Sequence, residues 1–224
     1  MDERSADIGA ALLARWRAIF EGRAGAEGRA GIEPGAVEDT GRGLLARYAE
    51  PRRRYHNLEH LAEVLEAIDE LAASARDVDV VRLAGWFHDA VYDPHRSDNE
   101  EASARLAAGL LPTCGVSEPR IAEVVRLVQL TAAHDPGPDD PDGAVLCDAD
   151  LAILASDPER YGRYASDVRA EYAHVEDEAF RRGRAAILDA LLGHDALFHT
   201  PAAHARWEER ARHNLHTELT LLHP

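Results

Sequence analysis

Apolar residues recur at intervals of three and four in ten segments of the chain, and no segment alternates strictly between apolar and polar residues. This spacing gathers the apolar side chains on one face of a helix, whereas a half-buried strand needs a period of two. The pattern therefore predicts an all-α fold. The helices are expected over roughly residues 4–21, 36–49, 57–74, 78–92, 98–111, 118–134, 145–155, 158–174, 176–193 and 201–222.

Helix-breaking residues separate these segments. A Gly-rich loop is expected at residues 22–35, and an acidic stretch rich in Pro and Gly runs from Asp135 to Gly143. We interpret that stretch as a solvated connector, with a mobile lid as the alternative. The chain has 224 residues and no internal repeat or long linker, which predicts a single domain over residues 1–224.

The formal net charge of −16 would repel a nucleic-acid backbone, so polymeric DNA or RNA is not an expected partner. A small phosphorylated molecule remains possible where a metal ion or local arginines offset the field. Cys114 and Cys147 have no neighbouring thiol at metal-ligand spacing, and we expect both to be buried and reduced.

No stretch approaches the roughly 18 consecutive apolar residues that a membrane span needs. The first residues, MDERSADIGA, also lack the basic-then-apolar order of a secretion signal. We therefore expect a cytoplasmic protein that does not bind membranes. The amphipathic ends, residues 4–21 and 201–222, would pack together or against a second subunit, so a homodimer is possible.

Ionisable residues stand in apolar surroundings at two places in the first half of the chain. His56 and His60 occur in YHNLEH at the start of an expected helix, four residues apart and so on one face. His88 and Asp89 close the apolar segment VVRLAGWFHDAVY, where an uncompensated charged pair would be costly to bury. A bound cation would compensate that cost.

Asp148 and Asp150 repeat the anomaly in VLCDADLAIL, at the opening of another expected helix. Imidazole and carboxylate ligands together suit zinc, iron, manganese, nickel or magnesium, and the absence of thiolates disfavours a purely structural site. We expect one or two divalent ions per chain. Such an ion would acidify a water molecule and polarise a phosphoryl oxygen, which predicts a hydrolase.

The order His60, then His88 and Asp89, then Asp150 resembles the HD superfamily of metal-dependent phosphohydrolases, whose four ligands follow as H, HD, D. The resemblance spans about residues 40–200. It implies an HD-domain-like helical bundle in which these four residues hold the metal and the terminal helices pack on the core. The strings RRYHNLEH, AGWFHDAVYDP, DADLAIL and RWEERARHNLHTEL are further similar to a bacterial group of HD phosphohydrolases without a defined substrate.

YHNLEH, HDAVYDP and CDADL also resemble the cyclic nucleotide phosphodiesterases, which carry YHN, HD and ADL in the same order. That resemblance implies that His56 is the general acid, that His60 is a ligand and that Asp89 can bridge two metals. Tyr92 stands where the phosphodiesterase motif has a further histidine. Cyclic nucleotide specificity is therefore not implied.

Two ligand assignments stay open from the residues alone. Asp148 could be the fourth ligand instead of Asp150, or it could cap the helix expected to begin near residue 145. His60 could merely cap or pack its helix while His56 binds the ion.

The roles of three further residues are also open. Asn99 and Glu100, in SDNEEASA, could orient a ligand imidazole or could belong to a helix-capping pattern. His134 could bind a second metal, or could lie at a helix C-terminus where a cation is favoured.

Basic and aromatic residues outside the ligand segments give two more alternatives. Arg52–Arg54 could clamp a substrate phosphate or form a solvated basic turn. Arg169, Glu171 and Tyr172 could line the pocket or pack their helix, and we assign them no role.

The function predicted is metal-dependent hydrolysis of a phosphomonoester or phosphodiester bond in a small, nucleotide-like molecule, with His56 and Asp89 as catalytic residues. One alternative is a dimetal oxygenase or lyase of the HD type, for which extra ligand histidines such as His134 or His95 would be a sign. The other alternative is a non-catalytic sensor that the metal stabilises.

Overall fold

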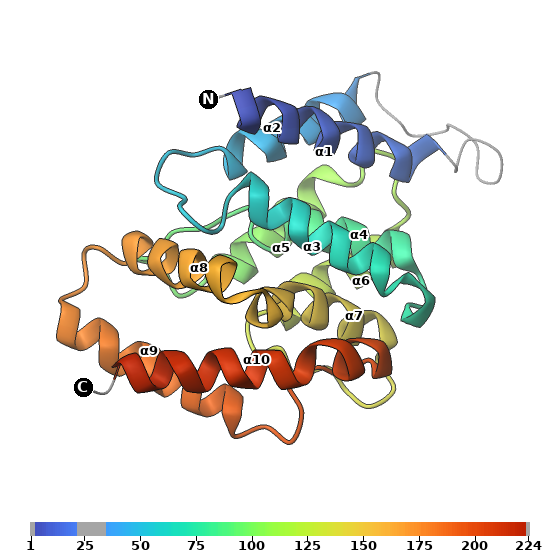
Figure 1. The fold of residues 1–224 in the computed structure, drawn as a ribbon. Helices are drawn as coiled ribbons and strands as arrows, with labels where there is room; N and C mark the ends of the chain where they lie inside the picture. The colour runs from blue at the N-terminus through green and yellow to red at the C-terminus, as the bar shows by residue number, and fades with distance from the viewer. Residues whose placement is uncertain (1–2, 22–34, 223–224) are drawn as a thin grey trace.

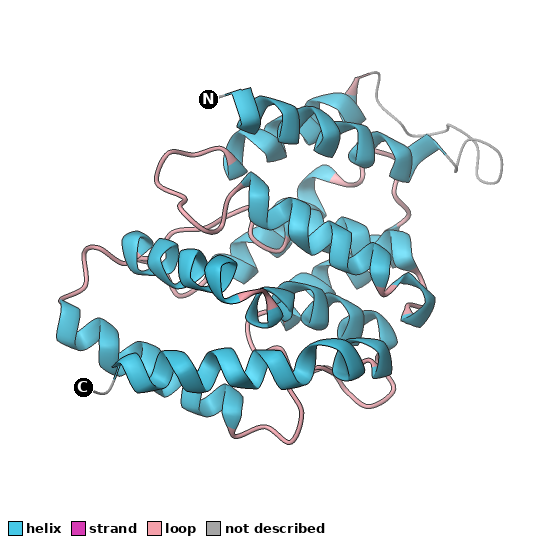
Figure 2. Cartoon of the chain, viewed as in Figure 1, coloured by secondary structure: helices cyan, strands magenta, loops and turns pink. Residues whose placement is uncertain are grey.

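The computed structural model describes residues 3–21 and 35–222, and within them it contains helices and no strands, as the sequence predicts (Figure 2). The expected Gly-rich loop at residues 22–35 lies outside the described residues apart from Gly35. The α-helices are α1 (Glu3–Glu21), α2 (Ala36–Tyr48), α3 (Leu58–Glu70), α4 (Val78–Phe87), α5 (Asn99–Leu110), α6 (Glu118–Leu130), α7 (Pro141–Leu151), α8 (Pro158–Glu171), α9 (Asp177–Leu192) and α10 (Pro201–Leu222).

Helix α4 lies at the centre and packs against α3, α5, α6 and α7 (Figure 1). Most of the helix surface is buried, and Asp79 and Arg82 keep one side partly exposed. Its buried residues include Val80, Val81, Leu83, Trp86 and Phe87. Helices α1 and α2 pack on one another and on α3, at the blue end of the molecule in Figure 1. Helix α10 packs on α9 and on the short 3₁₀ helix Ala152–Ala155 at the opposite end.

Helix α4 is shorter than predicted, since it ends at Phe87 and not near residue 92. The backbone beyond it bonds to side chains of other elements: Ser103 both accepts from Val91 N (3.0 Å) and donates to Val91 O (3.2 Å). These contacts replace helical hydrogen bonds, so the chain turns out of the helix immediately after His88.

Helix α3 begins where an asparagine caps it. The side chain of Asn57 accepts hydrogen bonds from Glu59 N (2.8 Å) and His60 N (3.3 Å), which satisfies two backbone donors of the first turn. The helix ends at Glu70, and the predicted remainder to residue 74 is a 3₁₀ turn, Ala72–Ser74. Gly85 lets α4 approach α3 closely, because a Cβ there would lie 2.8 Å from Ile68 Cδ1.

Helix α7 begins at Pro141, four residues earlier than predicted, because Asp140 caps it by accepting from Gly143 N (3.0 Å). Asp148 is therefore not an N-cap of this helix; it lies in the last two turns. Its buried carboxylate instead accepts from His199 N and Thr200 N, each at 2.7 Å, and so anchors the segment that precedes α10. The first turn of α10 is capped by Thr200, whose Oγ1 accepts from Ala203 N (3.2 Å).

Helix α6 ends at Leu130, and the predicted extension to His134 is a series of turns. His134 adopts the left-handed conformation, with φ 51°, that often follows a helix end. Cys114 and Cys147 are free and buried, as expected.

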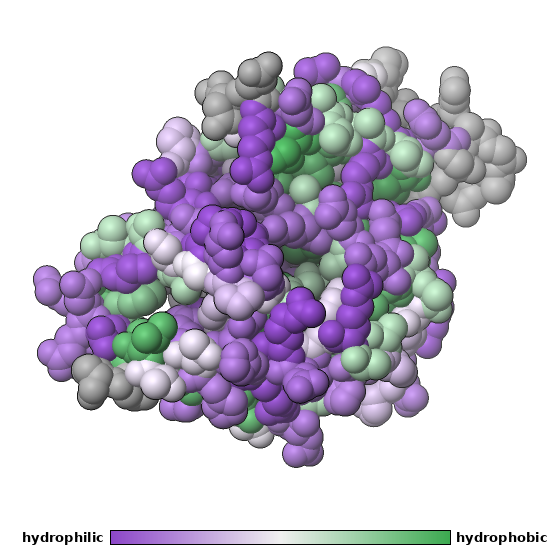
Figure 3. Space-filling model, in the orientation of Figure 1, coloured by the Kyte–Doolittle hydropathy of each residue, from purple (hydrophilic) through white to green (hydrophobic). Residues whose placement is uncertain are grey.

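The visible face in Figure 3 is mostly hydrophilic, with apolar patches scattered between charged side chains. Within the described part of the chain, no helix combines the length and apolar character needed to cross a membrane.

The anchoring role of Asp148 predicts a large stability effect. Asp148→Ala should lower the free energy of unfolding by about 3 kcal/mol, because it leaves the buried N–H of Thr200 and the partly buried N–H of His199 without an acceptor. Urea unfolding followed by circular dichroism measures this change. The control is Asp189→Ala, at an exposed position of α9, which should change stability by no more than about 0.5 kcal/mol. A similar small change for Asp148→Ala would disprove the anchoring role.

Candidate metal centre

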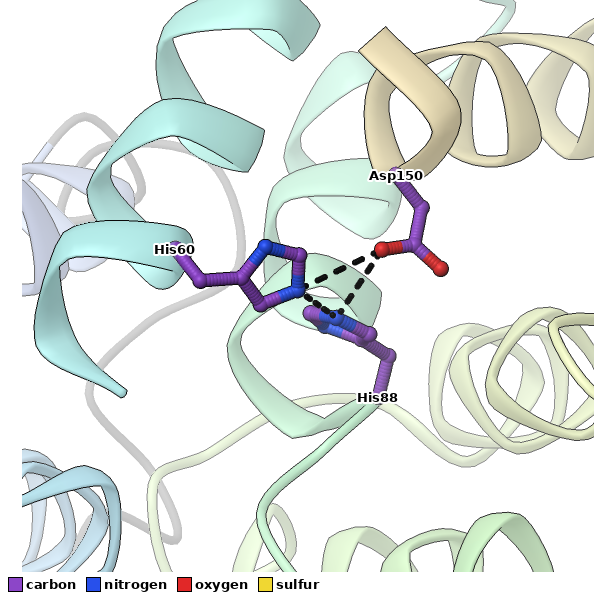
Figure 4. A group of neighbouring side chains, drawn as sticks. All are labelled: His60, His88 and Asp150. Atoms are coloured by element: carbon purple, nitrogen blue, oxygen red, sulfur yellow. Dashed lines mark hydrogen bonds and ion pairs between the residues drawn. The ribbon is translucent and has the colours of Figure 1, made fainter. Parts of the chain in front are cut away.

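Three helices bring His60, His88 and Asp150 together (Figure 4). His60 comes from the first turn of α3, His88 from the residue that follows α4, and Asp150 from the end of α7. The two Nε2 atoms lie 3.1 Å apart, and Asp150 Oδ1 lies 3.3 Å from that of His60 and 3.5 Å from that of His88. Both imidazoles are almost fully buried, with exposed fractions of 2% and 1%.

Asp89 completes the cluster from the chain segment beyond α4. Its Oδ2 lies 3.2 Å from His88 Nε2 and 3.5 Å from His60 Nε2. Two imidazole nitrogens and two carboxylates therefore face one another at the meeting point of α3, α4 and α7.

The backbone fixes the orientation of His88. Its Nδ1 donates a hydrogen bond to Gly85 O (2.8 Å), so in the neutral ring Nε2 carries the lone pair that faces the cluster. A second hydrogen bond of this kind is the usual means by which proteins orient a metal-binding histidine. The ring of Tyr55 packs against His60, with centroids 4.7 Å apart.

These distances fit a shared cation. Ligand atoms held about 2.0–2.2 Å from one ion lie about 3.0–3.5 Å from each other in octahedral or tetrahedral geometry. The three distances among His60 Nε2, His88 Nε2 and Asp150 Oδ1 run from 3.1 to 3.5 Å, so these three residues could share one ion. Asp89 approaches both imidazoles but lies outside that group of three. The donor set, imidazole nitrogen with carboxylate oxygen, suits a divalent transition metal.

The imidazoles and carboxylates of the cluster shift one another's pKa values. Burial lowers the pKa of His60 and His88, but the neighbouring carboxylates outweigh it and raise both pKa values. Burial raises the pKa of Asp89 and Asp150, yet the positive charge of His88 outweighs it and holds both well below their usual value. The protein alone therefore favours positive charge at the imidazoles, and a divalent cation would supply that charge in place of protons.

His134 reaches the cluster from its left-handed position after α6. Its Nε2 lies 2.8 Å from Asp150 Oδ2, the oxygen that faces away from His60 and His88. Neither reading of His134 from the sequence described this contact, which places a third imidazole beside the candidate ligands.

His56 belongs to a separate group beside the cluster. Its Nδ1 lies 2.6 Å from Glu171 Oε2, and its ring stacks on Tyr92 with centroids 4.0 Å apart. Tyr92 also donates its hydroxyl proton to Glu171 Oε2 (2.9 Å). With Nδ1 engaged, Nε2 is the ring nitrogen that remains for a substrate.

Glu171, at the end of α8, is held as a carboxylate. Burial raises its pKa, but the hydrogen bond with His56 and bonds from backbone N–H groups outweigh burial and lower the pKa to about 2. Its Oε1 accepts from three consecutive backbone nitrogens, those of Arg54 (2.8 Å), Tyr55 (2.9 Å) and His56 (3.1 Å). Glu171 thus fixes both the backbone and the ring of His56.

A pocket of about 440 Å³ joins the two groups. Asp89, Asp150 and His134 from the cluster line it, and so do His56 and Tyr92. The space is large enough for a small organic phosphate next to both the candidate ligands and the candidate acid.

The structure brings His60, His88 and Asp150 into one group, places Asp89 beside both imidazoles, and places His56 in a neighbouring group that lines the same pocket. Asp148 is not in the cluster. Glu171, to which the sequence analysis assigns no role, is central to the position of His56. Its signal was present in the sequence, because Tyr161, Tyr164, Val168 and Glu171 follow the buried stripe of α8 and the last is a carboxylate.

Two other open questions receive answers. Asn99 contacts no imidazole; its side chain accepts from Asp93 N (3.1 Å) and donates to Asp93 O (3.0 Å), which ties the segment after Asp89 to the start of α5. Arg53 neither binds a phosphate from the surface nor forms a solvated turn, because its side chain is 1% exposed. Arg52 is exposed and pairs with Glu50.

Comparison of the chain with protein-family models, with curated proteins and with solved structures found no match.

The contacts of Glu171 predict a pH-dependent stability. The depressed pKa, about 2 against a usual 4.5, means that the carboxylate stabilises the fold fully above pH 4.5 and loses this contribution as pH falls towards 2. Glu171→Gln should therefore lower the free energy of unfolding by about 3 kcal/mol at pH 7, and by about half as much at pH 3.

Urea unfolding of wild type and variant at both pH values measures this difference. Glu118→Gln, at an exposed position at the start of α6, is the control and should show no such change. A difference that stays constant between pH 7 and pH 3 would show that Glu171 acts through its shape and not through its charge.

Proposed function

We propose that this chain is a metal-dependent phosphohydrolase of the HD type, which hydrolyses a phosphomonoester or phosphodiester bond in a small, nucleotide-like molecule. The observation that carries the proposal is the convergence of His60, His88 and Asp150, with Asp89 beside both imidazoles, next to a pocket that Asp89, Asp150 and His56 line. Their order along the chain is that of the HD superfamily, and the same four residues are proposed as the metal ligands.

The charge of the pocket supports a metal-dependent reaction. Asp89, Asp150 and Glu100 line it in a protein whose formal net charge is −16. Among the described residues that line it, only Arg96 supplies a permanent positive charge, so the pocket without a cation disfavours a phosphate. A divalent ion at the cluster would offset the charge of its carboxylates, polarise a phosphoryl oxygen and lower the pKa of a water molecule.

His56 supplies the proton for the leaving group in this proposal. The attacking water gives one proton to solvent, its oxygen forms the new bond to phosphorus, the bond from phosphorus to the leaving oxygen breaks, and the proton on His56 Nε2 moves to that oxygen; a proton from solvent then restores His56. The carboxylate of Glu171 accepts from Nδ1 and so fixes the orientation of the ring. Tyr92 holds the ring in place from its face.

The contact of His134 with Asp150 favours a second candidate function. HD-type dimetal oxygenases use additional histidine ligands, and the ring of His134 lies within hydrogen-bond distance of a candidate ligand. His95, the other histidine named for this alternative, instead packs against His174, with ring centroids 3.8 Å apart. We rank the oxygenase second, because the pairing of His56 with a buried carboxylate suits proton donation.

Elemental analysis and phosphate-release assays on one preparation test the proposal. Wild type should carry one or two equivalents of a transition metal and release phosphate from nucleotides or generic phosphate esters. Asp89→Ala should lose most of the metal and at least about 100-fold in turnover, because it removes a ligand that faces both imidazoles.

The control is Asp189→Ala, which removes an exposed carboxylate of α9 and should leave both metal content and turnover unchanged. Wild type without bound metal would refute the metal centre. Bound metal with iron-dependent oxygen consumption and no phosphate release would favour the oxygenase. Full metal occupancy and ligand binding without any turnover would favour the sensor.

Substrates with different leaving groups test whether His56 acts as a general acid or as a metal ligand. His56→Asn should reduce turnover by about 100-fold or more for alkyl or nucleoside esters, which need a proton on the departing oxygen. It should reduce turnover by less than about 10-fold for p-nitrophenyl esters, whose leaving group is stable without one, and metal content should not change. Equal losses for both ester types, or loss of the metal, would contradict the role as acid. His95→Asn, at an exposed histidine, is the control.

A further inference from the structure

Arg53 is buried between the two chain segments that carry His60 and His88. Its Nη1 donates to His56 O (3.1 Å) and to Asp89 O (2.6 Å), and its Nη2 donates to Ala90 O (3.2 Å). The acceptors belong to the turn before α3 and to the turn after α4. One guanidinium therefore connects the start of one helix to the end of the other.

The surroundings of this guanidinium are unusual for a buried charge. The nearest carboxylate oxygen, that of Glu50, lies 3.6 Å from Nε, and Nε has no hydrogen-bond partner among the described residues. The rings of Tyr48 and Tyr92 lie 5.1 and 5.7 Å from the central carbon and provide cation–π contacts. An apolar side chain of similar length would fill the same volume without burying a charge.

Only the arginine fork satisfies these carbonyls together. The carbonyls of Asp89 and Ala90 lie beyond the last turn of α4, where helical partners are missing. The planar group presents several donors in a fixed arrangement and reaches carbonyls from both segments, whereas a lysine ammonium is a compact point charge.

We propose that Arg53 is a positioning residue of the metal centre, which sets the spacing between the α3 and α4 ligands without touching the ion. His60 lies one helical turn after His56, and Asp89 contributes both a carbonyl to Arg53 and a carboxylate to the cluster. Loss of the link would let the two segments move apart and would separate the imidazoles. This inference rests on the proposed function, since it requires that the cluster binds a metal.

Titration of the purified protein with Co²⁺ tests the inference. The variants are Arg53→Met, which keeps the length of the side chain, and Arg53→Lys, which keeps its charge. The control is Arg184→Met, because Arg184 is also a buried arginine (9% exposed side chain), but it binds Glu218 and Tyr164 and none of the ligand segments. Circular dichroism first confirms that each variant is folded at the assay temperature.

Arg53→Met should raise the Co²⁺ dissociation constant by about 10- to 100-fold and alter the visible absorption of bound Co²⁺, as is usual when a group that orients ligands is removed. Arg53→Lys should show an intermediate effect, and it decides the question if Arg53→Met does not fold. Arg184→Met should lower the melting temperature and leave the Co²⁺ affinity and spectrum as in wild type.

Wild-type affinity and spectrum in a folded Arg53 variant would overturn the inference while leaving the metal centre intact. An equal loss of affinity in Arg184→Met would also overturn it, because general destabilisation would then explain the effect. Failure of wild type to bind Co²⁺ would refute the proposed metal centre, and this inference with it.

Discussion

The contact between two buried imidazoles and two carboxylates is the interaction on which the arrangement of this chain's central helices depends. Such a group is costly inside an apolar core unless each charge meets an opposite one at short range. Local contacts bring the imidazoles to the carboxylates. Asn57 caps α3 three residues before His60, and Gly85 both accepts from His88 and lets α4 approach α3. Electrostatic compensation and helix packing thus impose one geometry.

Helix α7 shows how neighbouring carboxylates acquire different tasks. Asp142 accepts from Arg76 N (2.6 Å) and Asp77 N (3.1 Å) at the start of α4, Asp148 anchors the segment that precedes α10, and Asp150 joins the cluster. The helix therefore connects two helix starts with the candidate metal centre. Because Asp148 and Asp150 are two residues apart, they point to different sides of the helix and cannot both serve the same site.

The sequence predicted the helices and the segments that supply the cluster, because both leave local signals: a helical period in one case, and charged residues inside apolar strings in the other. It did not predict where α4 ends or where α7 begins, since the side-chain hydrogen bonds of Ser103 and Asp140 at these points come from the fold and not from a helical period. The helical period of α8 marks Glu171 as a carboxylate on a buried face, but it does not identify His56 as the partner, because the two residues are 115 positions apart. Both predictions for Arg52–Arg54 were wrong for Arg53 for a related reason, because only tertiary packing distinguishes a buried arginine from an exposed one within a basic triplet.

Residues 53 to 60 combine the guanidinium link, the candidate acid, the helix cap and the first ligand within eight positions. A rigid turn of this kind fixes the distance between acid and ligand, because the hydrogen bonds of Asn57 and Glu171 leave its backbone little freedom. Tyr92, three residues after Asp89, stacks on His56 and so also links this turn to the segment that follows α4. If the proposed function holds, a substrate in the pocket would meet a candidate acid and candidate metal ligands whose relative position is set before it binds, which would reduce the reorganisation that the reaction requires.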